Sequence, residues 1–175
     1  MRGFSQLLLC VFILTLVGCG RQLSEAETDY LGGLLGSGLA VERVRVSSTG
    51  PEIAQSDAPP RLIVTGSALS CDAPPDTRAI LMAHEATHVW QWQNRDITGY
   101  SPFAAVMENI RARDPYSYEL EAGKPFLDYG FEQQARIVGD FVCHSAADPN
   151  SAKTKALGAL LKPVFGPGAT LAGRN

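Results

Sequence analysis

The stretch from Thr77 to about Arg95 constrains this chain most, because it predicts one long helix with two histidines on the same face. Asp76 is a suitable N-cap before the stretch and Gly99 follows it, as is typical of helix boundaries. His84 and His88 lie four residues apart, so their side chains stack on one side of such a helix. Whether this face is a metal site or an ordinary amphipathic surface depends on whether the stretch is helical, whether a third ligand exists and whether the compartment suits the chemistry.

The residues His84-Glu85-Ala86-Thr87-His88 have the spacing of a zinc site with its own catalytic base. Two imidazoles one turn apart can both reach one ion at about 2.0–2.1 Å. Glu85 is offset by one position, where it can take a proton from a water held beside the ion. The alternative is a solvated polar face, but the apolar neighbours Leu81 and Val89 favour a buried helix, in which buried histidines need partners.

A catalytic zinc site needs a third protein ligand, and we select Glu132. It begins a second predicted helix, and a carboxylate in that position is how glutamate-type zinc peptidases complete their site. Alternatives stay open for Glu132: a charge favoured by the helix dipole, or an ion pair with Arg136. His144 is a second candidate for the third ligand. The other acidic candidates downstream are Glu108, Asp114, Glu119, Glu121, Asp128 and Asp140.

Two further side chains are candidates for supporting roles. Asp140 could accept a hydrogen bond from the free N–H of a ligating imidazole, and an ion pair with Arg136 is the alternative. Tyr129, or Tyr118, could donate a hydrogen bond to an oxyanion, although packing is the more common role of a tyrosine in an aromatic loop.

The N-terminus predicts export. After Arg2, an apolar run too short to span a membrane comfortably suits a signal peptide over residues 1–18. Leu16-Val17-Gly18-Cys19 resembles a bacterial lipobox, which implies a lipid on Cys19 and a short tether over residues 19–23. An uncleaved anchor helix and a plain secretory signal are the alternatives. The resemblance to sorted lipoproteins implies that Gly20 does not signal inner-membrane retention, so we expect a periplasm-facing protein on the outer membrane.

The expected roles of the four cysteines follow from the predicted export. Cys10 is lost with the signal peptide and Cys19 carries lipid, which leaves Cys71 and Cys143. In an oxidising space these two are expected to form a disulfide, which stabilises by roughly 3–4 kcal/mol. Buried free thiols are the alternative, and no CxxC spacing indicates zinc ligation.

The remaining chain predicts one α+β domain over residues 24–162, followed by a flexible tail over 163–175. A net charge of −3 without a basic run argues against nucleic acid as a partner. The expected strands are 41–46 and 61–65, and the expected helices are 25–35, 77–95, 104–113, 131–145 and 151–161. The Ser24-Glu27 pair is a capping box.

Several segments resemble a known family. Three segments resemble the metallopeptidase domain associated with extracellular contractile injection systems: Leu31 to Val46, which ends in Val44-Arg45-Val46, then Ile63 to Gly66, and then Leu81 to Gln91. Tyr116 to Leu120, Phe126 to Gly130 and Glu132 to Ala135 resemble the bacterial Vgr-related proteins. The resemblance implies a zincin-like fold, zinc at His84 and His88, and Glu85 as base. A lipobox is a departure from typical injection-system components.

We therefore expect a mostly helical, zincin-like domain with a small β-sheet that binds one Zn²⁺. Its partners would be a peptide or protein substrate, the membrane through the lipid, and a secretion or injection system. The alternative is a non-catalytic envelope lipoprotein that uses the same fold as a binding module.

Overall fold

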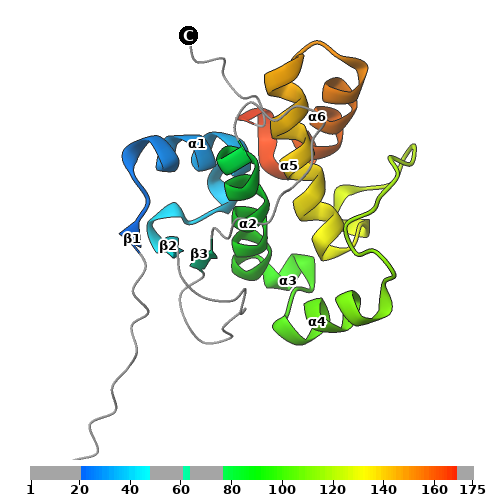
Figure 1. The fold of residues 1–175 in the computed structure, drawn as a ribbon, viewed down its shortest axis with the longest axis horizontal. Coiled ribbons are helices and arrows are strands. Elements are labelled where there is room, and N and C mark those ends of the chain that lie inside the picture. The colour runs from blue at the N-terminus through cyan, green and yellow to red at the C-terminus, as the bar shows by residue number, and fades with distance from the viewer. Residues whose placement is uncertain (1–20, 48–60, 64–76, 169–175) are drawn as a thin grey trace, which may run out of the picture.

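A computed structural model describes residues 21–47, 61–63 and 77–168, and helices dominate these ranges. Two long helices, α2 (Thr77–Gln93) and α5 (Phe131–Ala147), lie side by side at the centre (Figure 1). Helix α1 (Glu25–Leu35) packs on α2, and α6 (Ala152–Phe165) packs on α5. The short helices α3 (Arg95–Thr98) and α4 (Pro102–Arg111) follow α2.

A small sheet accompanies α1 and α2, in the strand order β1-β2-β3. Strand β1 (Arg21–Gln22) runs antiparallel to β2 (Arg45–Ser47), and β2 runs parallel to β3 (Arg61–Ile63). The mostly helical chain with one small sheet agrees with the expected α+β class. Arg21 and Gln22 pair with β2, so these two residues of the expected tether belong to the sheet. The expected strand at 41–46 begins later, because Val41–Arg43 form a 3-10 turn, η2.

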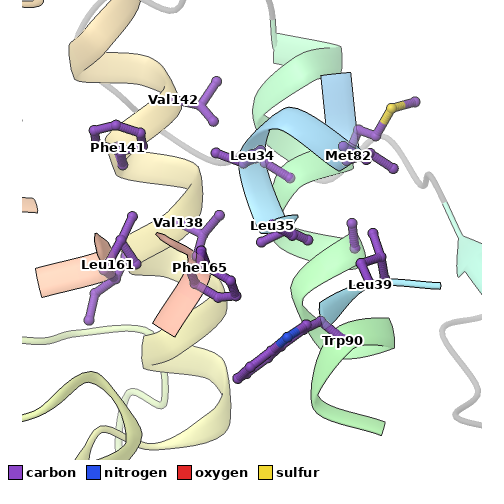
Figure 2. Packing of buried hydrophobic residues seen from close by; sticks show 14 of the residues in the cluster. Leu34, Leu35, Leu39, Met82, Trp90, Val138, Phe141, Val142, Leu161 and Phe165 are labelled. Atoms are coloured by element: carbon purple, nitrogen blue, oxygen red, sulfur yellow. The ribbon is translucent and has the colours of Figure 1, made fainter. Parts of the chain in front are cut away.

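The core lies between α1, α2, α5 and α6 (Figure 2). Its residues recur at helical spacing on the facing sides of these elements, so each helix buries one apolar stripe. The fully enclosed side chains of the core include Leu31, Leu34, Leu35, Ile80, Phe126, Ile137, Leu157 and Leu161. At about 25 cal/mol per Å² of apolar surface, this burial is the main term that holds α2 beside α5.

The C-terminal helix extends to Phe165, past the expected end at Leu161. Phe165 is buried, with its ring centroid 4.9 Å from that of Trp90 and 5.4 Å from that of Phe126. This packing carries the helix through Pro163, whose ring removes one backbone donor near the helix end. Gly36 adopts φ 64°, and a Cβ there would lie 2.6 Å from the Phe165 carbonyl oxygen, so this close approach requires glycine.

Several features predicted from the sequence concern residues that the structure does not describe. The signal peptide, Cys19, Cys71, Asp76 and residues 169–175 lie outside the described ranges. Within those ranges, no helix combines the length and apolarity that crossing a membrane requires.

Candidate metal centre

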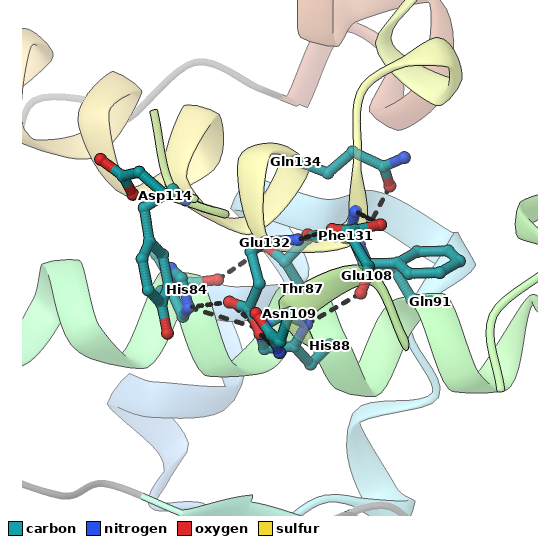
Figure 3. Close-up of polar contacts among 12 residues, drawn as sticks. His84, Thr87, His88, Gln91, Glu108, Asn109, Asp114, Phe131, Glu132 and Gln134 are labelled. Carbon is teal, nitrogen blue, oxygen red and sulfur yellow. Dashed lines mark hydrogen bonds and ion pairs between the residues drawn. The ribbon is translucent and has the colours of Figure 1, made fainter. Parts of the chain in front are cut away.

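Side chains from α2 and α5 converge on one point (Figure 3). His88 Nε2 lies 3.3 Å from His84 Nε2 and 3.2 Å from Glu132 Oε2, and His84 Nε2 lies 3.4 Å from the same Glu132 oxygen. One ligand atom from each residue thus lies within 4.8 Å of the others. We call His84, His88 and Glu132 the HHE cluster. It could bind a metal ion.

Helix geometry explains the convergence. Residues 84 and 88 stack on one face of α2, as their spacing predicts. Glu132 lies in the first turn of α5, whose unsatisfied N–H groups favour negative charge. The Glu108 carboxylate from α4 accepts hydrogen bonds from the Phe131 N–H at 3.0 Å and the Glu132 N–H at 3.2 Å. Glu108 therefore ties α4 to the turn that carries Glu132.

Glycine permits this contact. A Cβ at residue 130 would lie 2.7 Å from Glu108 Oε1 and 3.0 Å from Glu108 Cδ, which is closer than such atoms approach. Gly130 is the N-cap of α5, so a larger residue would push the capping carboxylate away from the helix start. The backbone at this position thus helps to place Glu132.

The cluster is nearly closed to solvent, with side-chain exposures of 5% for His84, 19% for His88 and 13% for Glu132. Burial alone lowers the pKa of His88, but the hydrogen bond and charge of Glu132, with additions from Glu85 and Gln91, raise it to about 9. Burial alone raises the pKa of Glu132, yet hydrogen bonds to His84 and His88 hold it well below its usual range. Without a metal, a proton on His88 therefore balances the carboxylate.

Glu85 lies next to the cluster on α2 and is half-buried. Its charge acts on His88 and on Tyr100, so the carboxylate is near both groups. Burial raises the pKa of Tyr100 to about 12, and the charges of Glu132 and Glu85 add to the effect. The Tyr100 hydroxyl thus keeps its proton at neutral pH, and its ring centroid lies 6.4 Å from that of His88.

The structure gives the expected supporting residues hydrogen-bond partners other than the imidazoles. Asp140 accepts hydrogen bonds from Tyr118 Oη at 2.8 Å and Arg136 Nε at 2.8 Å, which is the ion-pair alternative. The Tyr129 hydroxyl donates to the Glu119 carbonyl and accepts from the Glu121 N–H, both at 3.1 Å. Its described hydrogen bonds thus hold the 119–130 loop.

His144, the alternative third ligand, is twelve residues beyond Glu132 on the same helix. That separation corresponds to about 18 Å of rise along α5. Accordingly, the group of potential ligands found among the described residues contains Glu132 and does not include His144.

Three polar residues near the cluster escaped the sequence analysis, and Glu108 entered it only as a candidate ligand. Gln91 Oε1 lies 2.9 Å from His88 Nδ1, and Gln91 Nε2 donates to Gln134 Oε1 at 3.0 Å. Asn109 Nδ2 makes a long contact of 3.5 Å with Glu132 Oε1, and Glu108 caps α5. The position of Gln91 three residues after His88, on the same helix face, was the one local signal. The other three positions depend on how distant helices pack.

Cys143 is fully buried in α5 and is disulfide-bonded. Its expected partner, Cys71, lies outside the described residues. The Cys71–Cys143 pairing therefore stays a prediction, while the buried free thiol alternative does not hold for Cys143.

Comparison with known proteins relates the chain to one group. It is 31% identical over 131 residues to the type VI secretion system spike protein VgrG2b of Pseudomonas aeruginosa. The match covers 70% of this chain and 13% of the spike protein's length. The solved effector domain of Pseudomonas aeruginosa VgrG2b has a TM-score of 0.55 and 26% identity, with 83% of each chain covered. No family model matches the chain.

The two similarities concern the same protein, once by sequence and once by structure. The chain is therefore homologous to the VgrG2b effector domain and is Vgr-related, which confirms that part of the expected resemblance. Because the chain spans only 13% of the spike protein, the activity and partners of the whole spike protein do not transfer with the homology.

Proposed function

We propose that this chain is a zinc-dependent metallopeptidase with a zincin-like fold, held in the bacterial cell envelope by a lipid on Cys19. His84, His88 and Glu132 would hold the ion, and Glu85 would act as general base. The described group contains three candidate ligands, which leaves a fourth position of a tetrahedral site open, as in catalytic zinc sites.

The spacing of the three ligand atoms carries the proposal. Zinc binds nitrogen and oxygen at about 2.0–2.2 Å, so neighbouring ligand atoms in a tetrahedron lie about 3.3–3.5 Å apart. The three distances in the HHE cluster are 3.2, 3.3 and 3.4 Å. A charge-assisted hydrogen bond prefers about 2.7–2.9 Å, so a simple ion pair would be tighter. The residues thus fit zinc, and the imidazole–carboxylate set suits this metal.

The chemistry would then depend on Glu85. When bound, zinc supplies a Lewis acid that polarises a peptide carbonyl and lowers the pKa of water. The Glu85 carboxylate, half-buried beside His88, would take a proton from the attacking water. Glu85 would later pass that proton to the leaving amine nitrogen. Glu132 and Gln91 hold the imidazoles in place through the contacts described above.

Two further parts of the proposal concern the biological role of the chain and its location in the cell envelope. Homology to the VgrG2b effector domain supports an effector role related to type VI secretion. A peptide or protein as substrate follows from the proposed hydrolysis. The lipobox supports a periplasm-facing position on the outer membrane. Labelling cells with a tagged fatty acid tests the anchor: the wild-type chain should carry label, and Cys19→Ser should lose it.

Hydrolysis of a proteome-derived peptide mixture, read by mass spectrometry, tests the reaction. Glu85→Gln should lose at least about 100-fold in rate, because general base catalysis contributes about 10²–10⁴-fold. It should keep its zinc, since Glu85 is outside the ligand set. Glu121→Gln, on the exposed loop, is the matched control and should cleave as the wild type does. Unchanged hydrolysis in Glu85→Gln would falsify the mechanism, and zinc binding with no hydrolysis by the wild type would favour the binding module.

A further inference from the structure

Two buried glutamines connect His88 to the backbone at the start of α5. Gln91 and Gln134 have exposures of 0% and 1%, so every polar atom of their amides must find a protein partner. Gln91 comes from α2, three residues after His88, and Gln134 comes from the first turns of α5. Figure 3 shows both beside the HHE cluster.

The direction of each amide is fixed by backbone carbonyls, which can only accept hydrogen bonds. Gln134 Nε2 faces the carbonyl oxygen of Tyr129 at 2.7 Å and that of Leu127 at 3.4 Å, so this end of Gln134 is the NH₂ group. Gln134 Oε1 is then the atom that faces Gln91, at 3.0 Å.

The same logic orients Gln91. Its Nε2 faces the Phe131 carbonyl oxygen at 3.0 Å as well as Gln134 Oε1, and both of these are acceptors. The NH₂ group thus uses both protons, and the oxygen of Gln91 is left for His88 Nδ1 at 2.9 Å. An oxygen there requires His88 Nδ1 to carry a proton and donate it.

We propose that Gln91 and Gln134 form a polarity relay that holds the proton of His88 on Nδ1 and presents Nε2 to the metal position. Gln91 is a positioning residue in this account, because it acts through His88. Its second bond, to the Phe131 carbonyl, ties the histidine to the residue directly before Glu132. One amide therefore controls both the orientation of a ligand and its distance from the next ligand. This inference rests on the proposed zinc site.

Zinc affinity, measured by competition with a chelator, tests the relay. Gln91→Leu should bind zinc about 10–100-fold more weakly than the wild type, which is the usual cost of losing a partner behind a ligating histidine. Gln91→Glu keeps an oxygen facing His88 and should recover most of that affinity. It should still melt at a lower temperature than the wild type, because the Phe131 carbonyl loses its donor.

Gln93→Leu is the matched control. Gln93 lies on the same helix and its amide also bridges two backbone groups, accepting from the Ala40 N–H at 2.7 Å and donating to the Ala40 carbonyl at 3.3 Å. Its loss should lower stability and leave zinc affinity unchanged. Equal zinc affinity in Gln91→Leu and wild type would overturn the relay, as would equal losses in Gln91→Leu and Gln91→Glu.

A measurement on the wild type tests the relay even if the Gln91 variants do not fold. The Nδ1 proton of His88 should give an NMR signal that exchanges slowly with solvent, because it is buried and hydrogen-bonded. The signal is expected in the zinc-free protein at neutral pH as well as in the zinc-loaded protein. Rapid exchange of this proton overturns the relay, whereas a protected proton in a chain that binds no zinc removes the proposed zinc site and leaves the relay intact.

Discussion

Two glutamates in this molecule each lie between two nitrogen-bearing side chains, yet their surroundings differ. Glu27 contacts Arg21 through Oε2 at 2.6 Å and Arg78 through Oε1 at 2.8 Å. Glu132 instead places the single atom Oε2 at 3.2 Å from His88 and 3.4 Å from His84. Both glutamate side chains are 13% exposed, but the arginines are 47% and 62% exposed.

The comparison teaches that the flanking nitrogens decide what such a carboxylate can do. A guanidinium never releases its protons, so the contacts of Glu27 can only be ion pairs. An imidazole offers a lone pair once it is deprotonated, and so becomes a metal ligand. The short distances at Glu27 suit charged hydrogen bonds, and the longer, shared distances at Glu132 suit an ion at their centre.

The largest expected difference is in zinc binding by a matched pair of variants. Glu132→Gln replaces a charged ligand by a weak one, so zinc affinity should fall by at least about 100-fold, beyond the range typical of residues behind the ligands. Glu27→Gln should bind zinc as the wild type does, since Glu27 lies in the N-terminal helix cap. Chelator competition measures both affinities.

Thermal unfolding measures zinc binding by Glu132→Gln and Glu27→Gln independently, as stabilisation of the folded state. Zinc at 100 times its dissociation constant should stabilise the wild type by about 2.7 kcal/mol, which corresponds to roughly 5–10 °C. Glu27→Gln should show the same shift, and Glu132→Gln should gain at most about 0.4 kcal/mol, because its dissociation constant is expected to be at least 100 times larger. A full zinc shift in Glu132→Gln would mean that the third ligand is another residue.

The sequence predicted these two regions unequally because their contacts span different lengths of chain. The capping box at Ser24 and the pair His84 and His88 involve residues three or four apart, so helix periodicity alone relates them. Glu132 was selected by its place at a helix start, and the structure brings it to the histidines. That position required a prediction that the second helix crosses the first.

The supporting contacts could not be predicted because they depend on packing between distant segments. Glu108 caps α5 only because α4 folds back against Gly130. Asp140 was a plausible acceptor for an imidazole N–H, but Arg136 lies one turn away on the same helix and donates to this carboxylate. The last helix was expected to end at Leu161, before a flexible tail that begins at Pro163, and the burial of Phe165 extends the helix through the first residues of that tail.

A smaller effect should appear in the pH dependence of stability at the acid end. The hydrogen bond from Arg21 lowers the pKa of Glu27 from 4.5 to about 2, against the opposing effect of burial. A lowered folded-state pKa stabilises the protein above pH 4.5, and this stability is lost as the pH falls towards 2. Because the arginines are exposed and screened, we expect about 1–3 kcal/mol.

Urea unfolding of zinc-free protein from about pH 2 to about pH 10 measures this effect and its alkaline counterpart. In Glu27→Gln, the free energy of unfolding should fall less steeply with decreasing pH (a flatter acid limb) than in the wild type, because the side chain no longer titrates.

At the alkaline end the pH dependence has the opposite sign. Glu132 raises the pKa of His88 from 6.5 to about 9 despite burial, so the stabilisation from protonated His88 is complete below pH 6.5 and is lost as the pH rises through 9. Glu27→Gln should leave that alkaline loss unchanged.

The smallest expected effect separates the helix cap from the ion pairs of Glu27. Ser24 Oγ accepts from the Glu27 N–H at 3.2 Å, while the Ser24 N–H donates to Glu27 Oε2 at 2.8 Å. Ser24→Ala removes only the first bond, since the second uses the backbone, and should cost about 1 kcal/mol of unfolding free energy. The bonds of Arg21 and Arg78 to Glu27 should persist, and the Ser24 hydroxyl is the smallest cause of the lowered Glu27 pKa, so the acid limb of Ser24→Ala should keep most of its wild-type slope. A limb as flat as that of Glu27→Gln would mean that the hydroxyl, rather than the arginines, sets the charge of Glu27.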